Sequence, residues 1–325
     1  MYITVTTIGT YQNKDDFIIL MCNLDKTFVA YNFVLKVMVF SFKRKQLSEL
    51  INEIRSSGDK VSDHIKRLMI LHVVIITVGA AVVLGLFGLL ALCKGEMVVE
   101  AWLPFDPHKN VMNSLLAMQM LFASFCVPIL GRSMAMQGMV CSIAMYLCQQ
   151  FINLQNRIKM LDYSPETETL MKMEFKEIIK KHIRLMRYSK LTSNIFEEYF
   201  FIQNIAVSVE LCLNAIMATM VGYQQMTLFA TFIGFLALAL INAYIYSFLG
   251  NEMIIQSQAI AEAAYEAPWT SWPLYMQKDL LLFISVAQKP LSLTAAGVVT
   301  VSMKSYSQAL YNGYSVFAVL NDLTD

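Results

Sequence analysis

Long apolar runs separated by polar segments set the organisation of this chain. Each run reaches or exceeds the roughly 20 residues that an α-helix needs to cross a bilayer. We predict six membrane-spanning helices, over residues 17–41, 68–93, 111–150, 195–221, 226–262 and 291–321. Only residues 222–225 separate the fourth and fifth spans, so these two helices should be antiparallel neighbours. The expected fold is an all-α, polytopic membrane protein with residues 1–325 in a single domain.

Charged residues fall within several of the predicted spans. Asp25, Lys26 and Lys36 fall within the first span, and Glu210 lies near the middle of the fourth. A charge within the bilayer costs free energy unless it is paired or faces a wet cavity, so these residues indicate helix contacts or function. The apolar run over 111–156 is too long for one upright helix and predicts a tilted helix that extends beyond the membrane.

Two of the polar segments are rich in Lys and Arg. Segments 43–67 and 154–190 contain seven and nine of these residues, whereas segment 94–110 contains two. Because Lys and Arg accumulate on the cytosolic side of membrane proteins, we place segments 43–67, 154–190 and 251–290 in the cytosol. Apolar residues at helical spacing predict a surface helix within 154–190, and residues 270–288 should form another amphipathic helix.

The last span, 291–321, has two faces at helical spacing. One face is a polar stripe with alternating steps of three and four, made of Ser305, Gln308, Asn312, Ser315, Val319 and Asp322. Such a stripe is costly against lipid, so it must face protein or water. From the residues alone two explanations stay open. A helix–helix seam held by Ser and Asn is the commoner case, and an aqueous pore lined by several copies is the other.

Composition supports membrane insertion and excludes several function classes. Hydrophobic residues make up 57% of the chain and charged residues 15%, against about 25% charged residues in average soluble proteins. A net charge of +1 and the lack of a basic, aromatic-interleaved patch argue against a nucleic-acid partner. No nucleophile–base pair, HExxH motif or phosphate loop occurs, so we expect no enzyme and no cofactor. Four scattered histidines and six cysteines without a CxxC pair predict no metal site.

A set of motifs follows in a fixed order near the C-terminus. It comprises Asn251-Glu252 followed by Ser257, Ala263-Ala264-Tyr265-Glu266 with Trp269, Gln288-Lys289-Pro290-Leu291, Leu293-Thr294-Ala295, Tyr306, and Tyr314-Ser315-x-Phe317. Leu103-Pro104-Phe105-Asp106 and Lys181-His182 agree more loosely. In these motifs the chain resembles the insect odorant receptor family, from about residue 15 to its end.

The resemblance implies a subunit of a ligand-gated, nonselective cation channel. In this family seven helices form each subunit, four subunits surround a pore lined by the last helix, and odour-specific subunits generally assemble with a shared co-receptor. The implied partners are therefore a co-receptor subunit in a heterotetramer, a small volatile odorant and membrane lipid. The implied location is the plasma membrane of sensory neurons. The resemblance also favours a pore over a seam for the polar stripe.

Three groups of candidate site residues follow from the resemblance. An apolar pocket for the odorant should be lined by Val83, Phe87, Met118, Phe122, Phe125, Phe229, Phe232 and Phe235. The pore should be lined by Ser305, Gln308, Asn312, Ser315, Val319 and Asp322, with Val319 and Asp322 at the gate. A cytosolic subunit interface should use Trp269, Trp272, Tyr275, Leu280, Leu281 and Ile284.

The sequence departs from the family pattern at its beginning and leaves two other functions open. The family's cytosolic tail and first helix have no counterpart before residue 17, which gives six spans instead of seven. A gustatory-type receptor shares the architecture, but its typical TYxxxxxQF ending is not matched after Ser305-Tyr306-Ser307. A small-solute transporter would need broken helices in two related halves, and only Pro128 fits that pattern.

Overall fold

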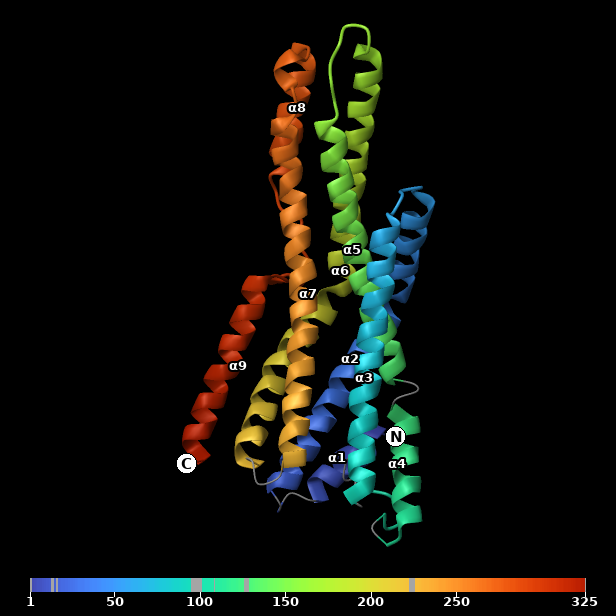
Figure 1. The fold of residues 1–325 in the computed structure, drawn as a ribbon, viewed down its shortest axis with the longest axis vertical. Coiled ribbons are helices and arrows are strands. Elements are labelled where there is room, and N and C mark those ends of the chain that lie inside the picture. Colours follow the sequence, from blue (N-terminus) through green and yellow to red (C-terminus); the bar gives the residue numbers. More distant parts are fainter. Residues whose placement is uncertain are drawn as a thin grey trace.

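Long helices make up almost all of the structure (Figure 1). The computed structural model describes residues 2–12, 15, 17–94, 101–107, 109–125, 129–221 and 226–324. The elements are α1 (Tyr2–Gln12), α2 (Phe17–Ser56), α3 (Asp63–Lys94), α4 (Val111–Phe125), α5 (Gly131–Lys159), α6 (Glu168–Val221), α7 (Met226–Glu266), the 3-10 helix η3 (Trp269–Ser271), α8 (Leu274–Ala287), β1 (Thr294–Ala295), β2 (Val299–Thr300) and α9 (Met303–Thr324). The all-α prediction is confirmed, apart from one two-stranded hairpin.

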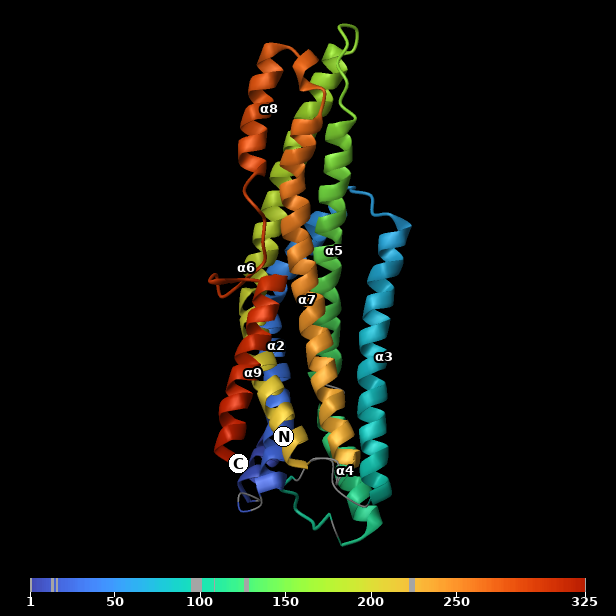
Figure 2. The same ribbon diagram turned by 60° about the vertical axis from the view of Figure 1, so that its left-hand side comes forward.

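The helices form a bundle from which three of them continue as a narrower extension (Figures 1 and 2). We define the extension as residues 148–183 and 253–290, which comprise one end each of α5, α6 and α7 together with α8. Its packed core is continuous with the core of the bundle and is made of Phe151, Leu154, Ile158, Met171, Phe175, Ile178, Met253, Ile260, Met276, Leu280 and Phe283. The extension is therefore a folded part of the protein and not a loose loop.

Two helices are longer than the sequence pattern predicts. α2 unites the predicted span 17–41 with part of segment 43–67, and α6 unites the surface helix with the span 195–221. Neither helix contains glycine or proline, so nothing in its sequence interrupts the backbone hydrogen bonds. Among the described residues, α6 and the Phe232–Glu266 part of α7 are long and apolar enough to cross a membrane by length and composition.

The prediction of a single helix over residues 111–150 is wrong. Two helices, α4 and α5, occupy this range, with a short π-helical stretch at 129–130. Pro128 lies between them in the sequence, outside the residues that the structure describes. Proline lacks a backbone N–H and collides with the preceding turn, so it breaks a helix whatever the surrounding hydrophobicity. The apolar residues on both sides concealed this break.

The helix predicted to begin at residue 291 begins only at Met303. Residues before it form a tight hairpin in which Thr294 pairs with Thr300 and Ala295 with Val299. Gly297 has a φ of 69°, which favours glycine, and Ala296 has a φ of 50°. Leu293, Ala295 and Val301 are buried, so the apolar residues in this segment serve a hairpin seated on α6 and not a membrane span.

A helix that the sequence pattern did not predict precedes α2. The helix α1 packs on α2, and its Tyr2 ring stacks on Phe125 of α4 with ring centroids 4.7 Å apart. Backbone hydrogen bonding also joins α1 to the loop before α4, where the Trp102 N–H donates to the Val5 carbonyl at 3.0 Å. Short helical segments of this kind carry little periodicity, which explains why it was missed.

Candidate functional site

The base of α9 is fixed by a side-chain cap and by close packing. Ser302 and Ser305 form a reciprocal cap in which the Ser302 N–H donates to Ser305 Oγ and the Ser305 N–H donates to Ser302 Oγ, at 3.0 and 3.3 Å. On α7, Gly250 lies directly against the Val301 backbone, and a Cβ at position 250 would come within 2.3 Å of the Val301 carbonyl oxygen. The start of α9 is therefore held tightly against α7.

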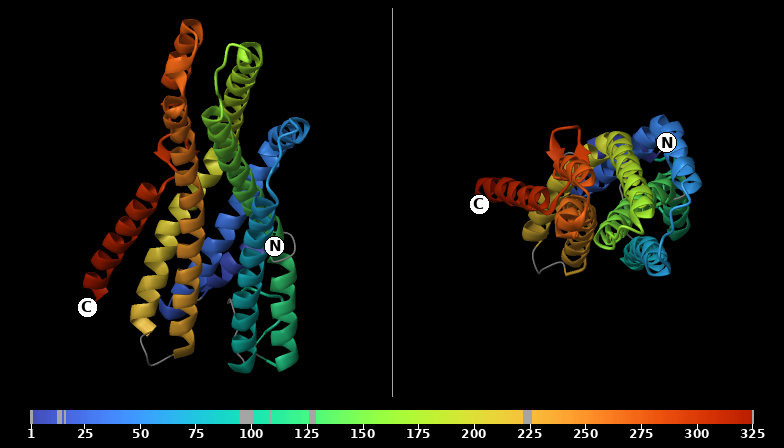
Figure 3. Two further views of the ribbon diagram at one scale, coloured as in Figure 1. Left: turned by 45° about the horizontal axis from the view of Figure 1, so that its top comes forward. Right: turned by 90° about the horizontal axis from the view of Figure 1, so that it is seen from above.

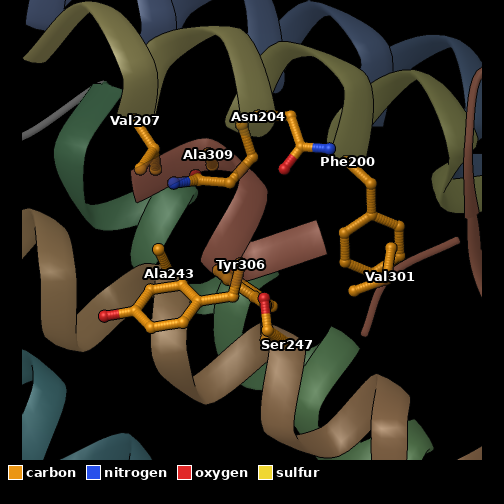
Figure 4. Close-up of a pocket in the computed structure, with 10 residues that line it drawn as sticks. Phe200, Asn204, Val207, Ala243, Ser247, Val301, Tyr306 and Ala309 are labelled. Carbon is orange, nitrogen blue, oxygen red and sulfur yellow. The ribbon is translucent and has the colours of Figure 1, made fainter. Parts of the chain in front are cut away.

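A small cavity lies next to this tight contact, between α6, α7 and α9 (Figure 4). Its volume is about 20 Å³, enough for one water molecule. Figure 4 shows Phe200, Asn204 and Val207 reaching from α6 toward Ala243 and Ser247 on α7 and Tyr306 on α9. Gln203 contributes to the same lining. Polar groups from three helices therefore meet at the base of α9.

The two faces of α9 have different surroundings. Tyr306 and Leu310 pack against Val207 and Leu211 of α6, and Gly313 lies against Leu211, where an added Cβ would be 3.1 Å from the Leu211 Cβ. The polar stripe behaves differently. Gln308, Asn312 and Val319 are exposed, Ser305 and Ser315 are half-buried, and the Asp322 side chain lies outside the described part. Seen from above, α9 projects away from the other helices (Figure 3).

Two separate groups contain the predicted odorant-binding residues that the structure describes. Met118 and Phe125 of α4 are half-buried against α1 and α2, with Phe125 also 6.0 Å from the Phe33 ring. Phe122, on the same helix, is 61% exposed.

The second group lies on α7. Phe232 is buried against Met217, Ala218 and Val221 of α6, Phe229 packs on that cluster, and Phe235 is half-buried. Val83 and Phe87 lie in α3, but their side chains are outside the described part. The structure therefore does not bring all predicted pocket residues into one cavity.

The predicted interface residues divide between the core and the surface of the extension. Trp272 and Leu280 are buried inside this chain, where the Trp272 ring meets Phe175 edge-to-face at 5.8 Å. Tyr275 and Leu281 are exposed, the latter by 68%, and Trp269 and Ile284 are half-buried. The neighbouring Leu282 is also 69% exposed, and sequence reasoning missed it. One side of α8 thus packs inward while the other presents large apolar side chains.

The charges that interrupt the predicted spans meet in a buried network between α2 and α6. Lys36 Nζ donates a hydrogen bond to Gln203 Oε1, and both side chains are buried. Asn32 Nδ2 donates to Glu210 Oε1 at 3.3 Å. Asn214 Nδ2 donates to Asp25 Oδ1 at 3.1 Å. This arrangement agrees with the prediction that these charges mark contacts between helices.

A second ionic cluster anchors the α2–α3 loop, and sequence reasoning did not find it. Asp59 accepts hydrogen bonds from Arg184 at 2.8 Å and from Tyr146 at 3.0 Å, and Lys181 Nζ lies 3.2 Å away. Burial alone would raise the pKa of Asp59, but the positive charges of Lys181 and Arg184 outweigh it and lower the pKa. Gly58, with a φ of 68°, turns the loop toward α5 and α6. An isolated Ser-Gly-Asp triplet gives no signal of such partners.

His182 is a structural residue of the extension. Its ring lies 4.9 Å from that of Phe283 on α8, and burial lowers its pKa to about 4. A neutral imidazole is therefore packed between α6 and α8. Among the described residues no group of three His, Cys, Asp or Glu side chains is placed to hold a metal ion.

Comparison with known proteins identifies the family. The profile of the 7tm Odorant receptor family matches residues 17–314. Odorant receptor 49a of Drosophila melanogaster is 26% identical over 230 residues, which cover 69% of this chain and 55% of that receptor. Odorant receptor 10 of Aedes albopictus is 27% identical over 145 residues, which cover 44% and 38% of the two chains. The chain thus spans about half the length of these relatives, which are receptors and not enzymes.

A solved structure shows the same fold. The insect olfactory receptor OR5 from Machilis hrabei in complex with eugenol superposes with a TM-score of 0.76 at 16% sequence identity. The superposition covers 99% of this chain and 86% of that one, so the whole helical arrangement is shared. The family profile covers most of the sequence, and the fold agrees with it: this chain belongs to the 7tm odorant receptor family.

Proposed function

We propose that this chain is an odorant-binding subunit of a ligand-gated, nonselective cation channel in the plasma membrane of sensory neurons. The position of α9 carries the proposal. Tyr306 and Leu310 pack on α6 and α7, whereas Gln308, Asn312 and Val319 remain exposed, together with Tyr311, Tyr314 and Val316. Four such helices around an axis would direct these stripes to a central aqueous path, where polar side chains are tolerated. This arrangement supports a pore over a seam within the chain.

The odorant is proposed to bind among α2, α3, α4 and α7. A small volatile molecule is mostly apolar, so its pocket should contain aromatic and methionine side chains and few polar groups. Phe122 and Met118 of α4 supply such a surface. Phe232 is fully engaged between α6 and α7, so in our proposal it supports the pocket wall by packing.

Assembly with a co-receptor subunit is proposed to use the outer side of α8. Leu281 and Leu282 are exposed by 68% and 69%, next to a core that keeps α8 in place. Exposed apolar residues on a rigid helix suit the core of a subunit interface. The Lys and Arg distribution supports a cytosolic position for this extension and for segments 43–67, 154–190 and 251–290.

The test is to express the chain in oocytes together with an odorant co-receptor subunit. Currents are recorded while a panel of volatile esters, ketones, alcohols and phenols, including eugenol, is applied. We expect an inward cation current with at least one compound, and none from oocytes that express the co-receptor with an unrelated membrane protein. A chain that reaches the surface with the co-receptor but never alters the current across the panel would contradict the proposal.

A further inference from the structure

Three pairs of residues join α2 to α6 in a common register. The pairs are Asp25 with Asn214, Asn32 with Glu210, and Lys36 with Gln203. Numbers rise along α2 while they fall along α6, as expected for antiparallel helices that contact each other through one continuous stripe. All but Glu210 are buried, and Glu210 is half-buried. Because a buried charge without its partner is costly, this stripe fixes how α2 and α6 can slide against each other.

The electrostatic contacts along the same stripe are mixed. Lys36 attracts Glu210 and Lys26 attracts Asp25, whereas Asp25 and Glu210 repel each other. A shift of one helix alone would separate Lys36 from Glu210 in a medium of low dielectric constant, which opposes the shift.

Gln203 belongs both to this stripe and to the cavity at the base of α9. Its Oε1 accepts the hydrogen bond from Lys36, and the same side chain lines the cavity with Asn204, Ser247 and Tyr306. α6 contacts both α2 and α9. A movement of α2 that displaces Lys36 therefore acts on a side chain that already adjoins the pore helix.

The packing around the base of α9 is uneven. Gly250 allows no added atom at its contact with Val301, whereas a cavity of about 20 Å³ adjoins Val301 and Tyr306. Because close-packed interiors transmit displacements, Gln203 lies where a shift of α2 would reach the less tightly packed side of the α9 base.

We propose that Lys36 and Gln203 are positioning residues that link α2, and hence the odorant pocket, to the base of the pore helix α9. The proposal rests on the proposed channel function. It adds a specific contact through which a displacement of α2 is transmitted to α9. Loss of either side chain should weaken the coupling between odorant binding and opening while the pore itself remains able to conduct.

The test is a double-mutant cycle in the full chain co-expressed with the co-receptor. Lys36→Met, Gln203→Leu and the double variant are compared at matched surface expression, using the panel compound that gives the largest current in the parent. We expect each single variant to raise the half-maximal odorant concentration about ten-fold. The double variant should be no worse than a single one, which is a coupling factor of about ten, within the range for residues in contact.

A conservative variant and a control variant distinguish loss of the Lys36–Gln203 contact from a general disturbance of the fold. Gln203→Glu still accepts a hydrogen bond from Lys36 and should stay within about two-fold of the parent. Ser208→Ala changes a polar residue on α6 whose hydroxyl bonds only to the Asn204 carbonyl among the described groups, and should also stay near the parent. If Lys36→Met fails to reach the surface, the contrast between Gln203→Leu and Gln203→Glu decides the question.

The outcomes distinguish this link from the channel proposal. If the parent chain gives no odorant current, both the channel proposal and the link are overturned. If the parent responds but the effects of the single variants multiply in the double variant, only the link is overturned. The same holds if Gln203→Leu and Gln203→Glu have equal effects.

Discussion

The Asp59 cluster should account for a measurable part of the stability of this receptor. The Asp59 side chain is 8% exposed and Lys181 is 11% exposed, whereas Arg184 is 36% exposed. Breaking a fully buried ion pair costs about 3–5 kcal/mol, and an exposed pair contributes about 0–1 kcal/mol. Because Arg184 is partly solvated and asparagine can still accept hydrogen bonds, we expect Asp59→Asn to cost about 2 kcal/mol.

The assay is the thermal unfolding of detergent-purified receptor, followed by the loss of the monodisperse peak in fluorescence-detected size-exclusion chromatography. A cost of about 2 kcal/mol corresponds to a fall of a few degrees in Tm. Asp63→Asn is the matched control, since Asp63 pairs with Lys66 at 2.9 Å but its side chain is 84% exposed, so Tm should change by less than about one degree. Equal effects of the two substitutions, or no effect of Asp59→Asn, would refute the reasoning.

Four other predictions follow from the structure. Phe122→Ala should shift the odorant dose–response by about ten-fold without loss of surface expression; an unchanged response profile would place the pocket elsewhere. Leu281→Asp should reduce pull-down of the co-receptor more than it reduces expression, whereas Lys278→Asp, a change at an exposed polar position of α8, should not. Val319→Ala should raise the resting current and Asp322→Lys should reduce inward cation conductance, both measured by voltage clamp at matched surface levels. His182 has a folded pKa of about 4, below about 6.5 in the unfolded chain, so stability should be complete above pH 6.5 and fall as the pH drops toward 4; His182→Phe should remove this loss in melts at pH 7.5 and 5.5.

The sequence indicated the class of fold because apolar length and Lys and Arg placement are strong, local signals. The same signals failed where a single residue determines the end of a helix, because hydrophobicity is averaged over many residues. Pro128 ends a run that hydrophobicity alone would continue, and the Ser302–Ser305 cap starts α9 later than its apolar flank suggests.

Contacts between distant residues were beyond sequence reasoning. Lys36 and Glu210 each indicated a costly charge, but nothing in the chain shows that Lys36 would meet Gln203, 167 positions away. Trp272 illustrates the converse case. An aromatic residue near a helix end suits an interface by composition, yet tertiary packing directs it into the core of its own chain. Burial direction on a short helix depends on its neighbours, which a single sequence does not list.

The unbroken length of α6 has a practical consequence for imaging. A helix of 54 residues is about 80 Å long, whereas the hydrocarbon core of a bilayer is about 30 Å thick. More than half of α6 therefore lies outside the hydrocarbon core, where it contacts α5, α7 and α8. The turn between α5 and α6 includes Met160, whose side chain is 82% exposed at the far end of this rod. An antibody fragment raised against that turn would be held rigidly, far from the detergent belt, and would serve as a fiducial mark for aligning electron micrographs of the assembled receptor.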